Sequence, residues 1–292
     1  MKIIHLRNEA IDRERWDSCI ALAGNQLTYA FTWYLDVVSP QWEALVSNDY
    51  EYIMPLPVKR RYKVPYLVQP ILTQQLGVFS KSQITEKIVE EFIKEIPYFS
   101  YELNFNEENF YPKALIFPNF LLNLHQNYTD IKAKYTKNTQ RNIEKAIKLD
   151  LKIKTELSLD EFLEFYSSIE KNFLTVRHSV LEKLLKIGVS VNAVKIYGIY
   201  SSNNKLIAGI CLLRSPKRLT YLLPASNNEG KTSSAMFLLI DKLIQENAGK
   251  DKVFDFEGSS VEGIARFYRG FGAKNKPYYI LKRFRPSFLI GK

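Results

Sequence analysis

Residues 253–273 constrain the fold of this chain more than any other stretch of the sequence. The stretch opens with bulky apolar residues that alternate with acidic ones, from Val253 to Glu257, which is the period-two pattern of a short buried strand. Gly258-Ser259-Ser260 follows, and this composition predicts a turn with a serine that caps a helix. Apolar residues then recur at helical spacing until two glycines end the helix: Ile264, Phe267, Tyr268 and Phe271.

A closing strand is predicted at Tyr278 to Leu281 together with Phe284, so this part of the chain reads as strand, helix, strand. Alternate residues of a strand point to the same face, so Asp255 and Glu257 share one face of the first strand. The sequence thus predicts two carboxylates at the end of a strand and the Tyr268 phenol on the helix that follows.

These residues resemble a known motif. Ala265-Arg266-Phe267-Tyr268, followed by Gly270-Phe271-Gly272, is similar to the last motif of the GNAT acyltransferases, in which a helical tyrosine precedes a Gly-Phe pair and a final strand. The strand end at Asp255 to Gly258, with the helix before it, resembles the branch with two GNAT-like halves. That branch includes the Fem-type aminoacyl transferases of cell-wall synthesis and related uncharacterised acyltransferases.

The resemblance implies an α+β fold made of two tandem GNAT-like domains, each a mixed, mostly antiparallel sheet flanked by helices. The order of predicted elements agrees, because strands, a helix at residues 81–96 and more strands come first. From Val194 onward the order is hairpin, strand, loop, helix, strand, helix and strand. We therefore predict a degenerate GNAT-like domain at residues 1–125 and a GNAT-like domain with the donor site at residues 126–292.

Charge and composition limit the partners and the location. Residues 1–125 hold 12 Lys and Arg against 15 Asp and Glu, whereas residues 126–292 hold 29 against 16. A surplus confined to one half indicates a polyanionic partner there, although a merely soluble basic surface would carry the same charge. No apolar run is long enough for a signal peptide or a membrane span, so we expect a cytoplasmic protein. Neither cysteine has a partner at ligand spacing and the histidines are scattered, so no metal site is predicted.

Residues 130–149 are predicted to form one helix with an apolar stripe and a basic stripe. The basic residues recur at spacings of three and four: Lys134, Lys137, Arg141, Lys145 and Lys148. Like charges so placed repel one another, so either solvent or an anionic ligand must offset the repulsion. Fem-type proteins have a comparable basic helix with an Arg-Asn pair, here Arg141-Asn142. The resemblance therefore implies a polyanion site on this helix.

Residues 225–232 fit a relaxed phosphate-binding loop before a predicted helix at 232–247. Too few residues follow for the parallel sheet of a nucleotide hydrolase, so we reject that function. Free backbone N–H groups and hydroxyls are still predicted at this helix N-terminus, which favours anions: Gly230, Lys231, Thr232, Ser233 and Ser234. In GNAT enzymes the corresponding loop binds the pyrophosphate of acyl-CoA, but the usual glutamine and glycine spacing is missing here. A plain Ser/Thr-capped helix is the alternative.

Acyl transfer to an amine needs a base for the amine, donors for the oxyanion and often an acid for the leaving group. The resemblance gives Tyr268 the role of acid or hydrogen-bond donor, and a core aromatic is the alternative. Asp255 or Glu257 could act as the base or bind a cationic acceptor. The alternative is that either carboxylate pairs with Arg266 or Arg269.

Together these features predict an N-acyltransferase in which an amine attacks the donor directly, without a metal ion. The donor is acyl-CoA or aminoacyl-tRNA, since the basic second half suits either polyanion. The acceptor is a small-molecule or peptide amine. Two other classes stay open: a non-catalytic binding module for RNA or a phosphorylated precursor, and a degenerate GNAT scaffold that serves as a subunit.

Overall fold

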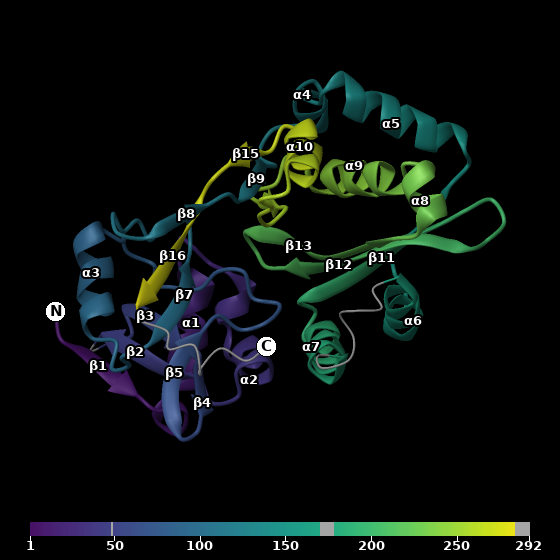
Figure 1. The fold of residues 1–292 in the computed structure, drawn as a ribbon. Coiled ribbons are helices and arrows are strands. Elements are labelled where there is room, and N and C mark those ends of the chain that lie inside the picture. The colour runs from purple at the N-terminus through teal and green to yellow at the C-terminus, as the bar shows by residue number, and fades with distance from the viewer. Residues whose placement is uncertain (48, 170–177, 284–292) are drawn as a thin grey trace. The chain divides into compact units, whose positions relative to one another are not determined.

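The computed structural model describes residues 1–47, 49–169 and 178–283. The chain divides into two compact units, the first formed by Met1–Pro118 with Lys276–Lys292 and the second by Asn119–Asn275. We predicted one crossing at residue 125, but the chain passes between the units at residues 118 and 275. The predicted strand at residues 114–124 breaks at Pro118, which has no N–H group for strand pairing. Figure 1 traces the chain through both units.

The first unit contains two sheets. One has the strand order β1-β2-β3-β6, with β1 at Ile3–Leu6, β2 at Glu43–Ser47, β3 at Tyr52–Leu56 and β6 at Phe79–Ser80. The other has the order β4-β5-β7-β16-β8, with β4 at Val58–Arg61, β5 at Val64–Val68, β7 at Tyr101–Phe105, β16 at Tyr278–Arg283 and β8 at Leu115–Phe117. The strand predicted to close the second half is therefore β16 of the first unit, where it pairs with β7 and β8. Phe284 lies outside the described residues.

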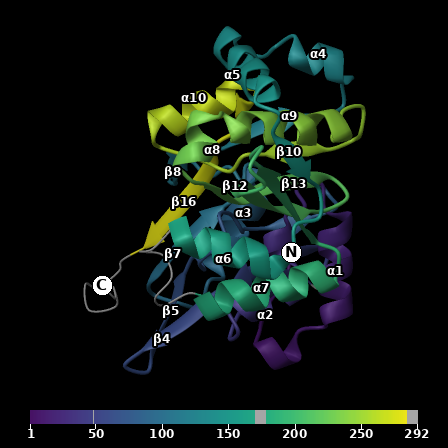
Figure 2. The same ribbon diagram turned by 90° about the vertical axis from the view of Figure 1, so that its right-hand side faces the viewer.

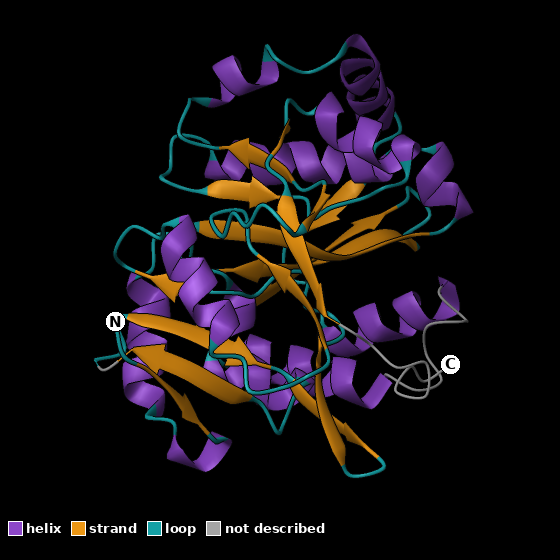
Figure 3. Cartoon of the chain, turned by 60° about the vertical axis from the view of Figure 1, so that its left-hand side comes forward, coloured by secondary structure: helices purple, strands orange, loops and turns teal. Residues whose placement is uncertain are grey.

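The helices of the first unit are α1 at Arg13–Leu22, α2 at Thr32–Val38 and α3 at Glu86–Lys94, with 3-10 turns at Asn8–Ala10 and Thr28–Ala30. Thr85 caps α3 through its hydroxyl, and the helix buries Val89 and Phe92 as its amphipathic sequence predicts. These two side chains join a core cluster with residues of both sheets, among them Leu45 of β2 and Leu103 of β7. Figure 3 shows the helices and strands of each unit.

The second unit is built on one sheet with the strand order β10-β11-β12-β13-β14-β9-β15. Its strands are β9 at Phe120–Asn123, β10 at Lys152–Lys154, β11 at Val194–Tyr200, β12 at Leu206–Arg214, β13 at Arg218–Ser226, β14 at Val253–Asp255 and β15 at Lys274–Asn275. Its helices are α4 at Tyr128–Lys132, α5 at Lys137–Lys148, α6 at Leu159–Ile169, α7 at His178–Ser190, α8 at Asn228–Thr232, α9 at Ala235–Asn247 and α10 at Glu262–Gly270. Helices α5, α8, α9 and α10 cover one face of the sheet, and α6 and α7 lie side by side on the other (Figures 1 and 2).

Two predicted helices are each divided in the structure. The segment at 130–149 breaks before Thr136, whose hydroxyl accepts a hydrogen bond from the Thr139 N–H and so starts α5 anew. The segment at 232–247 follows the short helix α8, and Ser234 separates α8 from α9 with a left-handed φ of 59°. Both breaks matter for the site, because they set the directions of the helices that carry the predicted binding residues.

Candidate active site at the end of strand β14

Strands β13 and β14 separate at one point in the second unit. They pair in parallel only where Arg218 to Thr220 face Val253 to Asp255. Beyond Asp255 the chain bonds instead to β9, since the Phe256 N–H donates to the Phe120 carbonyl and the Phe120 N–H donates to the Glu257 carbonyl. Strand β13 meanwhile continues beside β12 as far as Ser226. The separation opens the edge of β13 next to the predicted carboxylates.

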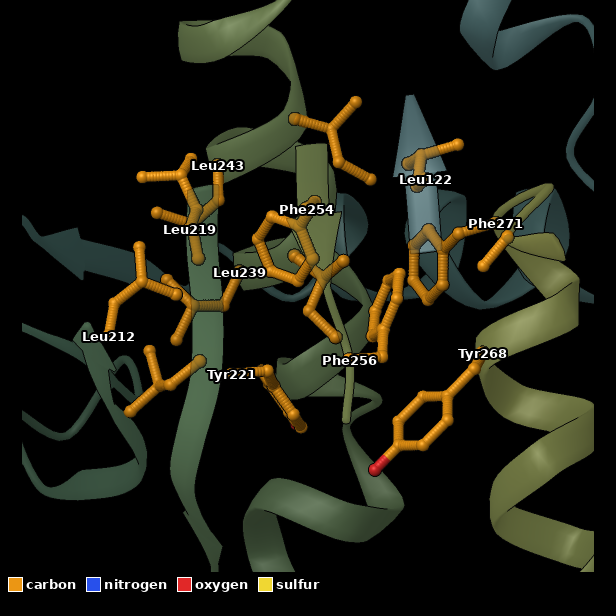
Figure 4. Packing of buried hydrophobic residues seen from close by; sticks show 14 of the residues in the cluster. Leu122, Leu212, Leu219, Tyr221, Leu239, Leu243, Phe254, Phe256, Tyr268 and Phe271 are labelled. Atoms are coloured by element: carbon orange, nitrogen blue, oxygen red, sulfur yellow. The ribbon is translucent and has the colours of Figure 1, made fainter. Parts of the chain in front are cut away.

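Tyr268 lies beside this separation. It is 8% exposed, and its ring centroid is 4.9 Å from that of Phe256 and 6.1 Å from that of Tyr221. Figure 4 shows its hydroxyl on the side of this aromatic cluster that faces away from Leu122 and Phe271. In the part of the chain that the structure describes, this hydroxyl makes no hydrogen bond. The ring therefore packs in the core, as the alternative interpretation expected, while the polar group remains available.

Burial raises the pKa of the Tyr268 phenol, and the negative charges of Glu257 and then Asp255 raise it further. A phenol with a raised pKa stays protonated throughout the physiological range. Tyr268 can therefore donate a hydrogen bond or a proton at this position but cannot serve there as a base.

Asp255 is fully buried and anchors the end of β14. The Arg218 Nη1 atom lies 2.7 Å from Asp255 Oδ2, and the Glu257 N–H donates to Asp255 Oδ1 over 2.9 Å. This pairing with Arg218 was not predicted, because Arg218 is distant in sequence and reaches Asp255 only through the β13–β14 pairing. A carboxylate held in this way orients its neighbours, so Asp255 is better suited to position Glu257 than to accept a proton from a substrate.

Glu257 holds an uncommon backbone conformation. Its φ is 59°, in the left-handed region, although it is not a glycine. Its N–H is bonded to the Asp255 carboxylate and its carbonyl to the Phe120 N–H, so neighbouring groups fix both sides of the residue. Backbone strain of this kind is often found where a side chain has a functional task. The half-buried Glu257 is thus the carboxylate at this site with the more accessible surroundings.

The predicted phosphate-binding residues are not a loop with free N–H groups. Gly230 lies inside α8, where its N–H donates to Asn227 Oδ1 over 2.8 Å. The N–H groups of Lys231, Ser233 and Ser234 are likewise bonded, to carbonyls within the same segment. A Cβ on Gly230 would lie 2.2 Å from the Ile207 carbonyl oxygen, so glycine is needed there for close packing on β12. The expectation of free donors at these residues was wrong.

Thr232 belongs to the same closed segment, since its hydroxyl donates to the Glu229 carbonyl over 3.0 Å. The next free donors along the chain are the N–H groups of Ala235 and Met236. Within the described residues neither makes a hydrogen bond, as expected for the first turn of α9.

The structure brings three of the predicted groups together around the start of α9. Phe237, in the first turn of α9, packs its ring centroid 4.7 Å from that of Phe267, the neighbour of Tyr268 on α10. The Ser234 hydroxyl donates to Asn142 Oδ1 of α5 over 2.7 Å. The segment around Ser234, the basic helix α5 and the helix α10 that carries Tyr268 are therefore packed against one another.

The basic stripe of α5 faces solvent. Lys137, Arg141 and Lys145 are exposed, and by their spacing they lie opposite the face that buries Ile143 and other core residues. Lys134 is not on this helix: it precedes the Thr136 cap, and its ammonium group donates to Gln126 Oε1. An exposed stripe of this kind is compatible with a solvated face and with a polyanion, so the polyanion site stays a prediction.

Two surface hollows lie elsewhere and use none of the predicted residues. A hollow of 520 Å³ in the first unit is lined by Arg15, Cys19 and Tyr50 among others. A second, of 330 Å³ in the second unit, lies between the start of α6 and the end of α7.

Over residues 1–47, 49–169 and 178–283, no group of three or more His, Cys, Asp or Glu is arranged to hold a metal ion. No helix among those residues is both long and apolar enough to cross a membrane.

Sequence reasoning missed Arg218, Tyr221 and Asn142 as parts of this region. Arg218 and Tyr221 lie on a predicted strand whose partner could not be identified from the sequence. Asn142 was noted only as half of the Arg-Asn pair. No local signal marks Arg218 or Tyr221, and the Arg-Asn pair does not indicate that Asn142 would meet Ser234, because each of the three contributes through contacts with residues far away in the chain.

The two units together form an α+β fold that several solved structures share. The crystal structure of FemX superposes with a TM-score of 0.67 at 12% identity, covering 96% of this chain and 97% of that one. The C-terminal domain assigned to a lysylphosphatidylglycerol synthetase from Agrobacterium fabrum gives a TM-score of 0.61 at 10% identity, with 95% and 93% coverage. The structure of L-PGS from Bacillus licheniformis gives 0.52 at 10% identity, with 83% and 84% coverage.

At these identities the similarity is one of fold. No protein-family profile matches the sequence, and the comparison with characterised protein sequences finds no significant match. The predicted fold class is confirmed, and the function has to be argued from the site.

Proposed function

We propose that this chain transfers an acyl or aminoacyl group from a polyanionic donor to an amine, by direct attack of the amine on the donor ester or thioester. The observation that carries this proposal is the Tyr268 hydroxyl, which is kept protonated and free of hydrogen-bond partners in the described chain beside the separation of β13 and β14. The tandem GNAT-like fold supports it over the whole length of the chain.

The chemistry assigns one role to each side chain. The amine nitrogen attacks the carbonyl carbon, and Glu257 accepts the proton that the nitrogen loses as the amide bond forms. When the tetrahedral intermediate collapses, the bond to the leaving oxygen or sulfur breaks, and Tyr268 donates a proton or a hydrogen bond to that atom. Asp255 is a positioning residue, because it holds the Glu257 backbone and is itself held by Arg218.

Aminoacyl-tRNA is the donor that this structure favours. The residues expected to bind the pyrophosphate of acyl-CoA have their N–H groups bonded inside α8 and its junction with α9. The exposed basic stripe of α5 suits an extended polyanion better than a single pyrophosphate. The name of the lysylphosphatidylglycerol synthetase whose domain shares this fold also points to an aminoacyl group.

Acyl-CoA remains a second candidate because of one feature. The N–H groups of Ala235 and Met236, unbonded within the described residues, lie at the start of the 13-residue helix α9, next to the Phe237 contact with the tyrosine helix. A helix N-terminus of this kind favours a phosphate group.

The two donors separate in a direct assay. Purified protein is incubated with radiolabelled aminoacyl-tRNA or with acetyl-CoA and a panel of primary amines, and transfer of label to an amine is measured. Tyr268→Phe should lower the transfer rate about 100-fold or more, because a proton donor in the transition state contributes about 10²–10⁴-fold. Tyr197→Phe is the matched control, since Tyr197 is a similarly buried tyrosine of the same unit on strand β11.

Retention of full transfer activity by Tyr268→Phe would refute the assigned role. Failure of the wild-type protein to transfer from either donor to any amine in the panel would refute the function itself. A thermal-shift experiment ranks the donors independently, since a ligand at 100 times its dissociation constant adds about 2.7 kcal/mol to apparent stability.

A further inference from the structure

The hairpin of β4 and β5 in the first unit ends in an unusual turn. Arg61 pairs with Val64, so Tyr62 and Lys63 form a two-residue connection between the strands. Their φ values are 50° and 65°, the left-handed conformation at both positions of a type I′ turn. Such turns prefer Asn-Gly, because a side chain in this conformation crowds its own backbone. A tyrosine and a lysine therefore hold these two positions against the local preference.

The side chains at this turn are presented to solvent. Tyr62 is 75% exposed, and the Arg61 guanidinium lies over its ring at 5.5 Å from the centroid. Lys63 is exposed as well, and in the described chain neither Arg61 nor Lys63 pairs with a carboxylate. Arg60, by contrast, is turned back toward Glu43 of β2 at 3.7 Å. The turn thus presents an exposed aromatic ring, with Arg61 over one of its faces, and two cations that pair with no carboxylate among the described residues.

The charge of the hairpin contrasts with its surroundings. Residues 58–64 carry four basic side chains and no acidic one, whereas the rest of the first unit, residues 1–57, 65–118 and 276–292, holds 13 basic and 15 acidic residues. Figure 2 shows the hairpin extending away from the rest of its sheet, below the label of β4. A positive tip with an exposed aromatic ring, on a unit whose other charges nearly balance, indicates a specific anionic partner.

We propose that the Arg61-Tyr62-Lys63 turn binds RNA, with the tyrosine ring stacking on an unpaired base and the two cations contacting the flanking phosphates. Every base presents a π-face, so a single exposed ring backed by an arginine makes a sequence-tolerant platform. A membrane surface suits this turn less well, because Val64, 43% exposed, is the aliphatic side chain at the tip and offers little area to insert.

The proposal goes beyond the transfer reaction and holds whether the donor is aminoacyl-tRNA or acyl-CoA. A purely structural account also exists for part of the charge, since β4 is the edge strand of its sheet and Lys or Arg on an edge discourages unwanted pairing. That account does not explain the exposed ring or the strained turn, and the experiment is chosen to separate the two.

The full chain is titrated into a fluorescent uridine oligonucleotide of about 12 residues, and separately into deacylated tRNA, at about 50 to about 300 mM salt. Tyr62→Asn/Lys63→Gly installs the preferred turn and should raise the melting temperature while weakening RNA binding about tenfold. Arg61→Gln/Lys63→Gln should flatten the dependence of log affinity on log salt by about 1.4 for the oligonucleotide. Lys87→Ala/Lys113→Ala removes two other exposed lysines of the same unit as a control.

Equal RNA affinity of the Asn-Gly variant and the wild type would overturn the proposal, as would absence of RNA binding by the wild type. An equal loss of affinity in the Lys87/Lys113 control would overturn it too, because binding would then reflect net charge alone. Vesicles containing anionic phosphatidylglycerol serve as the competing probe. If the turn variants lose vesicle binding but keep RNA binding, the partner is a membrane and the proposal is wrong.

Discussion

Replacing Glu257 by glycine should stabilise the protein and inactivate it at the same time. The left-handed φ of 59° costs a residue with a Cβ about 1–2 kcal/mol, and glycine avoids this cost. Glycine also gives the unfolded chain more freedom, which offsets about 0.5–1 kcal/mol of the gain. The backbone bonds to Asp255 and Phe120 do not involve the Glu257 side chain and persist. We therefore expect a net stabilisation of about 0.5–1 kcal/mol.

Chemical denaturation of the wild type, Glu257→Gly and Glu257→Gln measures this change. Glutamine keeps the Cβ and the strain but lacks the carboxylate, so its unfolding free energy should match that of the wild type more closely than that of the glycine variant. Both variants should lose transfer activity by about 100-fold or more, since both lack the proposed base. Stability and activity are thus expected to change together only in the glycine variant.

Two results would refute this reasoning. If Glu257→Gly is less stable than the wild type, the positive φ is not a source of strain and offers no argument for function. If Glu257→Gln keeps full activity, the carboxylate is not the base, and the strained backbone needs another explanation.

Further predictions concern the groups around the site. Gly230→Ala should destabilise the protein by about 2 kcal/mol in urea unfolding, because its Cβ would lie 2.2 Å from the Ile207 carbonyl oxygen; unchanged stability would contradict the packing role. Asp255→Asn should cost about 3 kcal/mol by the same measurement, since it leaves the buried Arg218 without its carboxylate, and an unaffected variant would show that the pair is not structurally important. The raised pKa of Tyr268 means that the unfolded phenol ionises near pH 10 before the folded one, so its contribution to stability is complete below pH 10 and declines above it. That decline should be reduced in Tyr268→Phe when melting temperature is followed against pH.

The sequence was sufficient to predict the elements near the site because they are local patterns. Strand β14 and helix α10 follow from alternating and helical spacing of apolar residues, and the tyrosine motif marks the fold class. The breaks at Thr136 and Ser234 were missed, since a capping threonine or a left-handed serine inside an otherwise periodic helix gives only a weak signal.

Long-range pairing is what the sequence could not supply. The pattern of β16 identifies it as a strand but does not say that it pairs with β7 and β8 of the first unit. The same limit applies to Asp255, whose nearest candidate partners in the sequence were Arg266 and Arg269. In the structure, the parallel pairing of β13 with β14 places Arg218 next to Asp255 instead. Pairing with an arginine was one of the two interpretations that the sequence left open, and only the topology identifies Arg218 as the partner.

The contacts of Asp255 and Glu257 explain why two neighbouring carboxylates can have different tasks. Asp255 forms an ion pair with the buried Arg218. Protonation of Asp255 would remove the negative charge from this pair and destabilise the fold, so the main task of this carboxylate is structural. Glu257 is half-buried, its backbone N–H donates to the Asp255 carboxylate, and its negative charge raises the pKa of the Tyr268 phenol. If packing alone decided these residues, glycine would be preferred at position 257 and phenylalanine at position 268. A positive φ is unfavourable for a residue with a Cβ, and the Tyr268 hydroxyl makes no hydrogen bond to residues that the structure describes. The strained backbone of Glu257 and the buried hydroxyl of Tyr268 are therefore the reason for which we propose that both residues act on a substrate.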